Sequence, residues 1–167
     1  MILDAPAALS NLTQSWNDFY SHSKAAADIV TFLHVGGLLL AGGLAIASDR
    51  MTFRALRYPA EERRNHMREV AAVHRMVIAG LAVVAVSGLA LFASDVDTFW
   101  GSWVFWVKMG LIVVLLVNGW VMTRVERQLA VDSSEGAPGW GGLHRAAVAS
   151  VVLWFAITLA GVMLTNV

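Results

Sequence analysis

Four long apolar segments, separated by shorter polar ones, fill most of the 167-residue chain. They cover about 26–48, 70–93, 102–123 and 144–165. At about 1.5 Å per helical residue, each segment is long enough to cross a hydrocarbon core of about 30 Å. Lipid offers the backbone no hydrogen-bond partner, so each segment is predicted to be a helix. Because the connections are short or modest in length, the pattern predicts an all-α, polytopic membrane protein built as an antiparallel four-transmembrane-helix bundle.

The first 25 residues are more polar and are predicted to form a separate N-terminal unit, ahead of a four-helix transmembrane domain at 26–167. Trp16, Phe19 and Tyr20 in this unit favour a short amphipathic helix on the membrane surface. A loosely ordered tail is the alternative. The segment lacks the basic stretch and apolar run of a cleavable signal peptide, so the spans themselves are expected to direct insertion.

Basic residues are concentrated beside one membrane face. Between the first two spans lie six arginines: Arg50, Arg54, Arg57, Arg63, Arg64 and Arg68. Arg124 and Arg127 follow the third span, whereas the opposite face has Lys24. By the positive-inside rule, we expect both termini to lie on the outer side of the membrane.

Composition agrees with a membrane protein and excludes several kinds of chemistry. Hydrophobic residues make up 57% of the chain and charged residues 14%, whereas a soluble domain carries about 25% charge. The formal net charge is zero, so nucleic acid is not an expected partner. The sequence has no cysteine, which excludes disulfides, thiolate metal ligands and cysteine nucleophiles.

Four ionisable side chains lie within or at the ends of the predicted spans: His34, His74, Lys108 and His144. Each costs roughly 2.5 to 3.5 kcal/mol at a helix centre, so each is a candidate for function. His34 lies about 12 Å and Lys108 about 9 Å below the outer ends of their spans, so these two share an outer layer. His74 and His144 lie close to the inner ends of theirs and share an inner layer.

The inner pair fits the ligation of haem b. Two histidines at similar depth, on helices that run in the same direction, can bind the two axial positions of one haem iron. Arg75 and Arg145 follow these histidines directly, and their guanidinium groups suit haem propionates. The alternative is that these arginines only fix topology while the histidines lie among lipid headgroups.

The outer pair suggests a reactive site. Aromatic residues surround Lys108 in TFWGSWVFWVK, so its ammonium group must either extend toward the interface or find a polar partner. His34 is the obvious partner, and beside a cationic lysine we expect it to be neutral, free to bind metal or accept a proton. We therefore predict His34 and Lys108 as catalytic residues, with His34 as a third candidate haem ligand. Close helix packing explains the glycines of GGLLLAGG after His34 more simply than a flat ligand does.

Three features together resemble a known family: a first-span histidine in FLHVGG, a third-span lysine in WVFWVKMGL, and four helices in fewer than 170 residues. The chain resembles the small bacterial membrane proteins related to HemJ-type protoporphyrinogen oxidase and to the membrane domain of CopD-type copper-resistance proteins. This resemblance implies that His34 and Lys108 act as a functional pair and that haem b is associated with the protein. It also implies a bacterial inner (plasma) membrane protein, whose outer side is periplasmic. His74 and His144 lie outside the family pattern.

The sequence therefore predicts a membrane-embedded redox protein with one or two haem b groups, which transfers electrons or, as an oxidoreductase, oxidises a porphyrinogen. Expected partners are the bilayer, haem or porphyrin, a redox partner or other membrane subunit, and a second copy of the chain. Two alternatives remain. One is a copper-handling protein, although its methionine sulfurs would be spread along the helices. The other is a cofactor-free structural subunit of a membrane complex.

Overall fold

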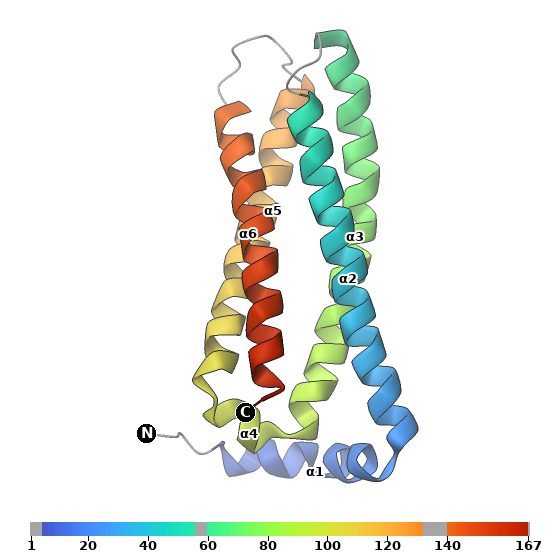
Figure 1. The fold of residues 1–167 in the computed structure, drawn as a ribbon, viewed down its shortest axis with the longest axis vertical. Coiled ribbons are helices and arrows are strands. Elements are labelled where there is room, and N and C mark those ends of the chain that lie inside the picture. The colour runs from blue at the N-terminus through green and yellow to red at the C-terminus, as the bar shows by residue number, and fades with distance from the viewer. Residues whose placement is uncertain (1–4, 56–59, 132–139, 167) are drawn as a thin grey trace.

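The computed structural model describes residues 5–55, 60–131 and 140–166, and it describes their side chains except at 52–55, 60–72, 74, 126–131 and 140. Six helices lie in these ranges: α1 (Ala7–His22), α2 (Lys24–Ala55), α3 (Ala60–Ser94), α4 (Val96–Gly101), α5 (Trp103–Val131) and α6 (Trp140–Leu164). The four long helices α2, α3, α5 and α6 run side by side in alternating directions (Figure 1). This arrangement confirms the predicted all-α bundle.

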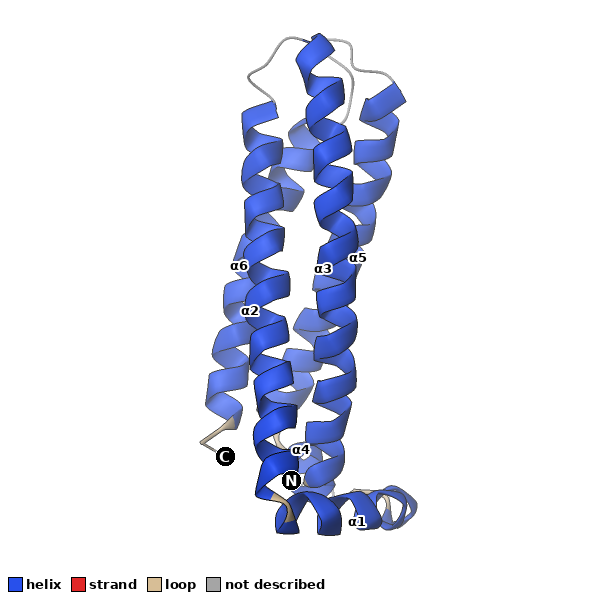
Figure 2. Ribbon diagram, turned by 90° about the vertical axis from the view of Figure 1, so that its right-hand side faces the viewer, coloured by secondary structure: helices blue, strands red, loops and turns tan. Residues whose placement is uncertain are grey.

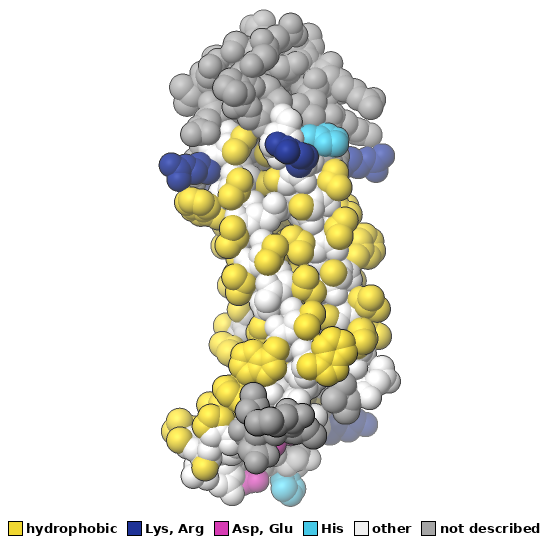
Figure 3. All heavy atoms as spheres, turned by 90° about the vertical axis from the view of Figure 1, so that its left-hand side faces the viewer, with side chains coloured by type: hydrophobic (Ala, Val, Ile, Leu, Met, Phe, Trp, Pro, Cys, Tyr) yellow, Lys and Arg dark blue, Asp and Glu magenta, His cyan; other side chains and the backbone are white. Residues whose placement is uncertain are grey.

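Each long helix contains a stretch that is long and apolar enough to cross a membrane. These stretches are Lys24–Met51, Arg75–Ser94, Trp103–Val125 and Gly141–Leu164, and they overlap all four predicted spans. At most 28% of any of them is buried within the protein, so the larger part of each apolar surface faces outward, as it does in a bilayer. Figure 3 shows hydrophobic side chains over the middle of the bundle, with Lys and Arg toward the ends.

The bundle consists of two closely packed helix pairs, α2 with α3 and α5 with α6, which are joined mainly through contacts between α2 and α6. Small residues bring α2 and α3 close together. A Cβ on Gly80 would lie only 2.9 Å from the Cβ of Ala41, and a Cβ on Gly37 would lie 3.0 Å from a methyl group of Val84. Gly37 and Gly80 thus serve close packing between these helices, whereas nothing lies within 4 Å of a Cβ on Gly36 or Gly43.

Two clusters of buried side chains form the core, and only the larger one joins the two helix pairs. The larger cluster combines Ala41, Leu115, Trp154 and Ile157, and thus joins α2, α5 and α6. Gly42 admits the indole ring of Trp154, because a Cβ there would lie 3.2 Å from the ring. The smaller cluster contains Met122, Leu143 and Ala147 and joins α5 to α6.

The first helix, α1, lies across one end of the bundle (Figure 2), which we call the α1 end. The indole nitrogen of Trp16 donates a hydrogen bond to the carbonyl of Ala90 at 2.8 Å, and the hydroxyl of Ser10 donates to Asp97 at 3.1 Å. These bonds attach α1 to α3 and α4. From Ala7 to His22, the N-terminal unit is therefore a helix packed on the bundle rather than a loose tail.

The opposite end is the arginine-rich end. Four of its described side chains, those of Arg50, Arg75, Arg124 and Arg145, are exposed. The two ends therefore differ in charge, as the sequence predicts. At the α1 end, Asp95 caps the short helix α4 by accepting a hydrogen bond from the amide of Thr98 at 3.2 Å.

Candidate functional site

His34 is the most closely surrounded of the histidines whose side chains are described. It lies on α2, half-buried against α3, with its Nδ1 at 3.1 Å from the carbonyl oxygen of Val84. A carbonyl can only accept, so Nδ1 carries the hydrogen in this bond. The hydroxyl oxygen of Ser87 lies 3.2 Å from the same nitrogen and 2.7 Å from the carbonyl of Val83, to which it donates. When the imidazole is neutral, its Nε2 is therefore left as an acceptor.

Gly88 provides the space that this histidine occupies. A Cβ at this position would lie 3.1 Å from Cε1 and 3.4 Å from Nδ1 of the His34 ring. The distance to Cε1 is shorter than a comfortable contact of about 3.5 to 4.0 Å between carbon atoms. Any larger residue would press the ring away from the Val84 carbonyl.

Lys108 of α5 is the other member of the predicted outer layer. The lysine side chain is half-buried and interacts electrostatically with the imidazole. Its Nζ lies against Gly161 of α6, 3.5 Å from where a Cβ would be. Lys108 forms no salt bridge with any carboxylate in the part of the chain that the structure describes. Each of the two helix pairs thus contributes one half-buried ionisable side chain to the apolar part of the bundle.

The inner layer is less fully defined. His144 lies on α6 beside the fully buried Leu143, and its own side chain is exposed. Arg75 and Arg145 are also exposed, and the Nε of Arg145 donates to the carbonyl of Gly141 in its own helix at 3.3 Å. His74 belongs to α3, but its side chain lies outside the described residues. The pairing of His74 with His144 therefore stays a prediction.

Asp49 is a buried polar residue that directly follows the first predicted span, 26–48. It lies within α2, is 3% exposed, and forms a hydrogen bond with the side chain of Ser150 on α6. It follows Ala41 and Ala45 at intervals of four residues, so it continues the face of α2 that packs in the core. This spacing is the signal that could have identified it.

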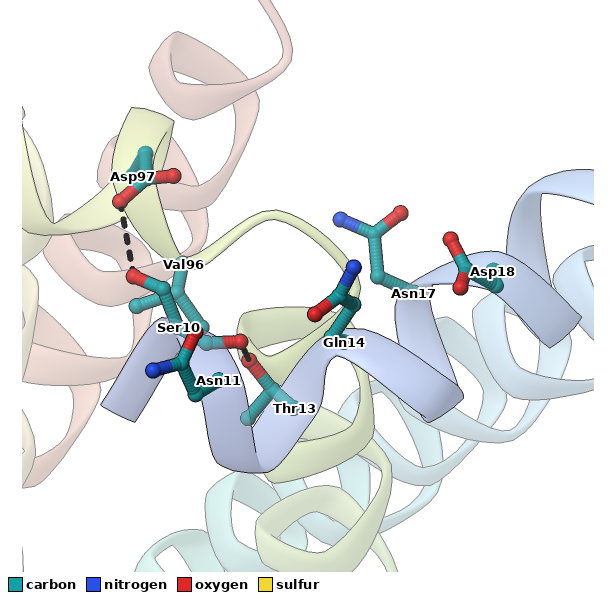
Figure 4. A pocket seen from close by; sticks show the side chains of 8 residues that line it. All are labelled: Ser10, Asn11, Thr13, Gln14, Asn17, Asp18, Val96 and Asp97. Carbon is teal, nitrogen blue, oxygen red and sulfur yellow. Dashed lines mark hydrogen bonds between the residues drawn. The ribbon is translucent and has the colours of Figure 1, made fainter. Parts of the chain in front are cut away.

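A polar pocket of about 300 Å³ lies between α1 and α4 (Figure 4). Its lining residues are Ser10, Asn11, Thr13, Gln14, Asn17, Asp18, Val96 and Asp97. It contains none of the predicted site residues. No group of three or more His, Asp or Glu side chains suited to a metal ion occurs within the described ranges.

Together, the fold and the site define a polytopic α-helical membrane protein with a half-buried histidine and a half-buried lysine among its apolar helices. Comparison with protein-family models, with curated proteins and with solved structures finds no match.

Proposed function

We propose that this protein is a membrane-embedded redox protein that binds haem b and transfers electrons or oxidises a porphyrinogen, with His34 and Lys108 as its reactive pair. One observation carries the proposal: the Nδ1 of His34 is bonded to the Val84 carbonyl, which leaves Nε2 of the neutral ring as an acceptor. The likeness of the FLHVGG and WVFWVKMGL motifs to those of HemJ-type proteins supports the same pair.

The donor set at His34 fits haem. Histidines that bind metal usually donate their other ring N–H to a carbonyl or carboxylate, which orients the ring and makes the ligating nitrogen more basic. His34 has this arrangement, and its Nε2 would hold the iron. When bound, haem supplies one-electron chemistry. The site fits a haem better than a bare metal ion, because a metal ion needs several protein ligands at one point.

Lys108 would bind a carboxylate or transfer a proton. It has no carboxylate partner of its own among the described residues, and haem and porphyrinogens both carry propionates. A lysine amine is compact, and it can release its proton in an apolar site more readily than a guanidinium group can. His34 can accept a proton at Nε2 when that nitrogen has no other ligand.

The arginine-rich end is the proposed place of a second haem, with His74 and His144 as axial ligands and Arg75 and Arg145 on its propionates. We further propose that this end faces the cytoplasm of a bacterium, with both termini on the outer side of its inner membrane.

The absorption spectrum of the purified protein tests haem binding. A Soret band and a sharp α-band on reduction are expected in the wild type, and His34→Ala should lose about one haem equivalent. His22→Ala is the matched control, because His22 lies exposed on α1, outside the bundle. A colourless wild-type protein, purified after haem supplementation, would exclude the proposal. Haem loss in His74→Ala and His144→Ala, with none in His34→Ala, would move the ligation to the arginine-rich end.

Lys108 is tested by two substitutions that separate binding from turnover. Lys108→Met and Lys108→Arg should both insert and keep haem, but should lose activity with a porphyrinogen or an external electron acceptor. Lys24→Met is the control, since Lys24 is an exposed cation at the start of α2. Full activity in Lys108→Met would remove the lysine from the mechanism.

A further inference from the structure

Helix α1 has an apolar stripe that the bundle does not cover. The side of α1 that packs on the bundle consists of half-buried residues at helical spacing: Leu9, Thr13, Trp16 and Tyr20. The residues one position earlier, turned by about 100° around the helix, are all exposed and form the α1 stripe: Ala8, Leu12, Ser15 and Phe19. Its two large side chains, Leu12 and Phe19, are 82% and 55% exposed. The stripe contains no residue of the His34 site, so the inference stands apart from the proposed function.

The stripe belongs to the apolar half of an amphipathic helix. Asn11, Gln14 and Asp18 lie on the other half, where their polar side chains line the pocket beside α4 (Figure 4). The stripe and the bundle-facing side are neighbours on the helix, and the bundle covers only one of them. Figure 3 also shows hydrophobic side chains on a part of the α1 end that projects sideways from the bundle. The uncovered stripe therefore suits an apolar neighbour.

The depth of α1 is that of the boundary between lipid headgroups and acyl chains. Trp16 donates its hydrogen bond to Ala90, which lies four residues, or about 6 Å, inside the end of the membrane-crossing stretch Arg75–Ser94. At its C-terminal end, α1 is followed by Ser23 and then directly by the stretch Lys24–Met51. Amphipathic helices at a membrane surface bury their apolar face about 5 to 10 Å into this boundary. The two attachments hold the α1 stripe at the same depth.

Acyl chains suit the stripe better than a second protein chain or lipid headgroups do. Leu12 and Phe19 offer at most about 200 Å² of apolar surface each, so together about half of the roughly 800 Å² that each partner contributes to a stable interface. Helix α1 contains no lysine or arginine, so it offers anionic headgroups no strong cation. The apolar surfaces of the long helices begin at the same depth, and the stripe continues them sideways.

We infer that the α1 stripe inserts among the acyl chains of the leaflet at the α1 end. Helix α1 is then held on one side by the bundle and on the neighbouring side by lipid. The partner is the hydrocarbon of that leaflet rather than a particular headgroup. The lipid contact is made by Leu12 and Phe19, whereas Trp16 and Tyr20 turn toward the protein.

Spin labels on the full-length protein test this inference. The chain has no cysteine, so Leu12→Cys and Phe19→Cys each give one site for a nitroxide label. In phosphatidylcholine vesicles, power saturation measures how often the label collides with oxygen, which concentrates in hydrocarbon, and with a nickel chelate, which stays in water. The ratio of the oxygen rate to the nickel rate should be several times higher at both positions than in Gln14→Cys. Gln14 is the matched control, because it is exposed on the polar half of the same helix.

Three results would overturn the inference. Equal ratios at the three positions would show that the stripe faces water. Labels at Leu12 and Phe19 that neither reagent reaches, with dipolar broadening that unlabelled protein removes, would show that a second copy covers it. A ratio that changes when phosphatidylglycerol replaces part of the phosphatidylcholine would place the contact at the headgroups. Leu12 is the more exposed of the two, so its label should not disturb the packing of α1; if Phe19→Cys does not fold, the ratio at Leu12 decides alone.

Discussion

Replacing Gly80 with alanine should separate the two most closely packed helices. A Cβ at this position would lie 2.9 Å from the Cβ and 3.3 Å from the Cα of Ala41, which is completely buried. Carbon atoms prefer a separation of about 3.5 to 4.0 Å, so α2 and α3 must move apart by about 0.6 Å or more. One of the contacts is with backbone, which cannot rotate away.

The size of the effect is estimated from a matched control. Overpacking a core by a methyl group typically costs about 1 to 3 kcal/mol. Alanine also favours a helix by about 1 kcal/mol over glycine, and Gly110→Ala on α5 isolates this gain because nothing lies within 4 Å of a Cβ there. The helix gain cancels in the comparison. Gly80→Ala should therefore be about 1 to 3 kcal/mol less stable than Gly110→Ala.

Reversible unfolding by SDS in mixed micelles, followed by circular dichroism, measures this difference in the free energy of unfolding. Equal stability of the two variants, or greater stability of Gly80→Ala, would refute the assignment of α2 and α3 as the tightest contact of the bundle.

Two hydrogen bonds between elements allow further predictions. Trp16→Phe removes the hydrogen bond of the indole to α3, worth about 1 kcal/mol, and should raise the rate of amide hydrogen exchange in α1 about fivefold. Trp103→Phe is the control, because Trp103 is exposed, and it should leave this rate unchanged. Equal exchange rates in the two variants would argue against docking of α1 on the bundle. Asn118→Leu removes the bond from its amide nitrogen to the α6 backbone at 2.9 Å and should lower the free energy of unfolding by about 0.6 kcal/mol. Thr158→Val serves as its control, because that hydroxyl bonds only to its own helix in the described structure. A loss in the threonine variant as large as in the asparagine variant would show that the bond from α5 to α6 adds nothing.

Depth in the membrane could be predicted from the sequence because it depends on position along a span. Counting residues from the span ends placed His34 and Lys108 in one layer, and in the structure the two half-buried side chains interact electrostatically. The hydrogen bonds that orient His34 could not be predicted in this way. They come from Val84 and Ser87, fifty residues or more along the chain, and depend on how α2 and α3 are rotated against each other.

By itself, the sequence determined the four membrane-crossing segments, the concentration of arginines at one end and the all-α class, because hydropathy and charge report directly on the solvent around each residue. Only the tertiary structure decided which face of each helix is buried. In a soluble protein the polar face of a helix shows which side faces water and which side faces the core. Lipid and protein core are both apolar, so the pattern along a membrane span does not show which side of the helix faces the core. For this reason the burial of Asp49 against Ser150, and the fit of the His34 ring over Gly88, were decided by helix packing rather than by any local pattern.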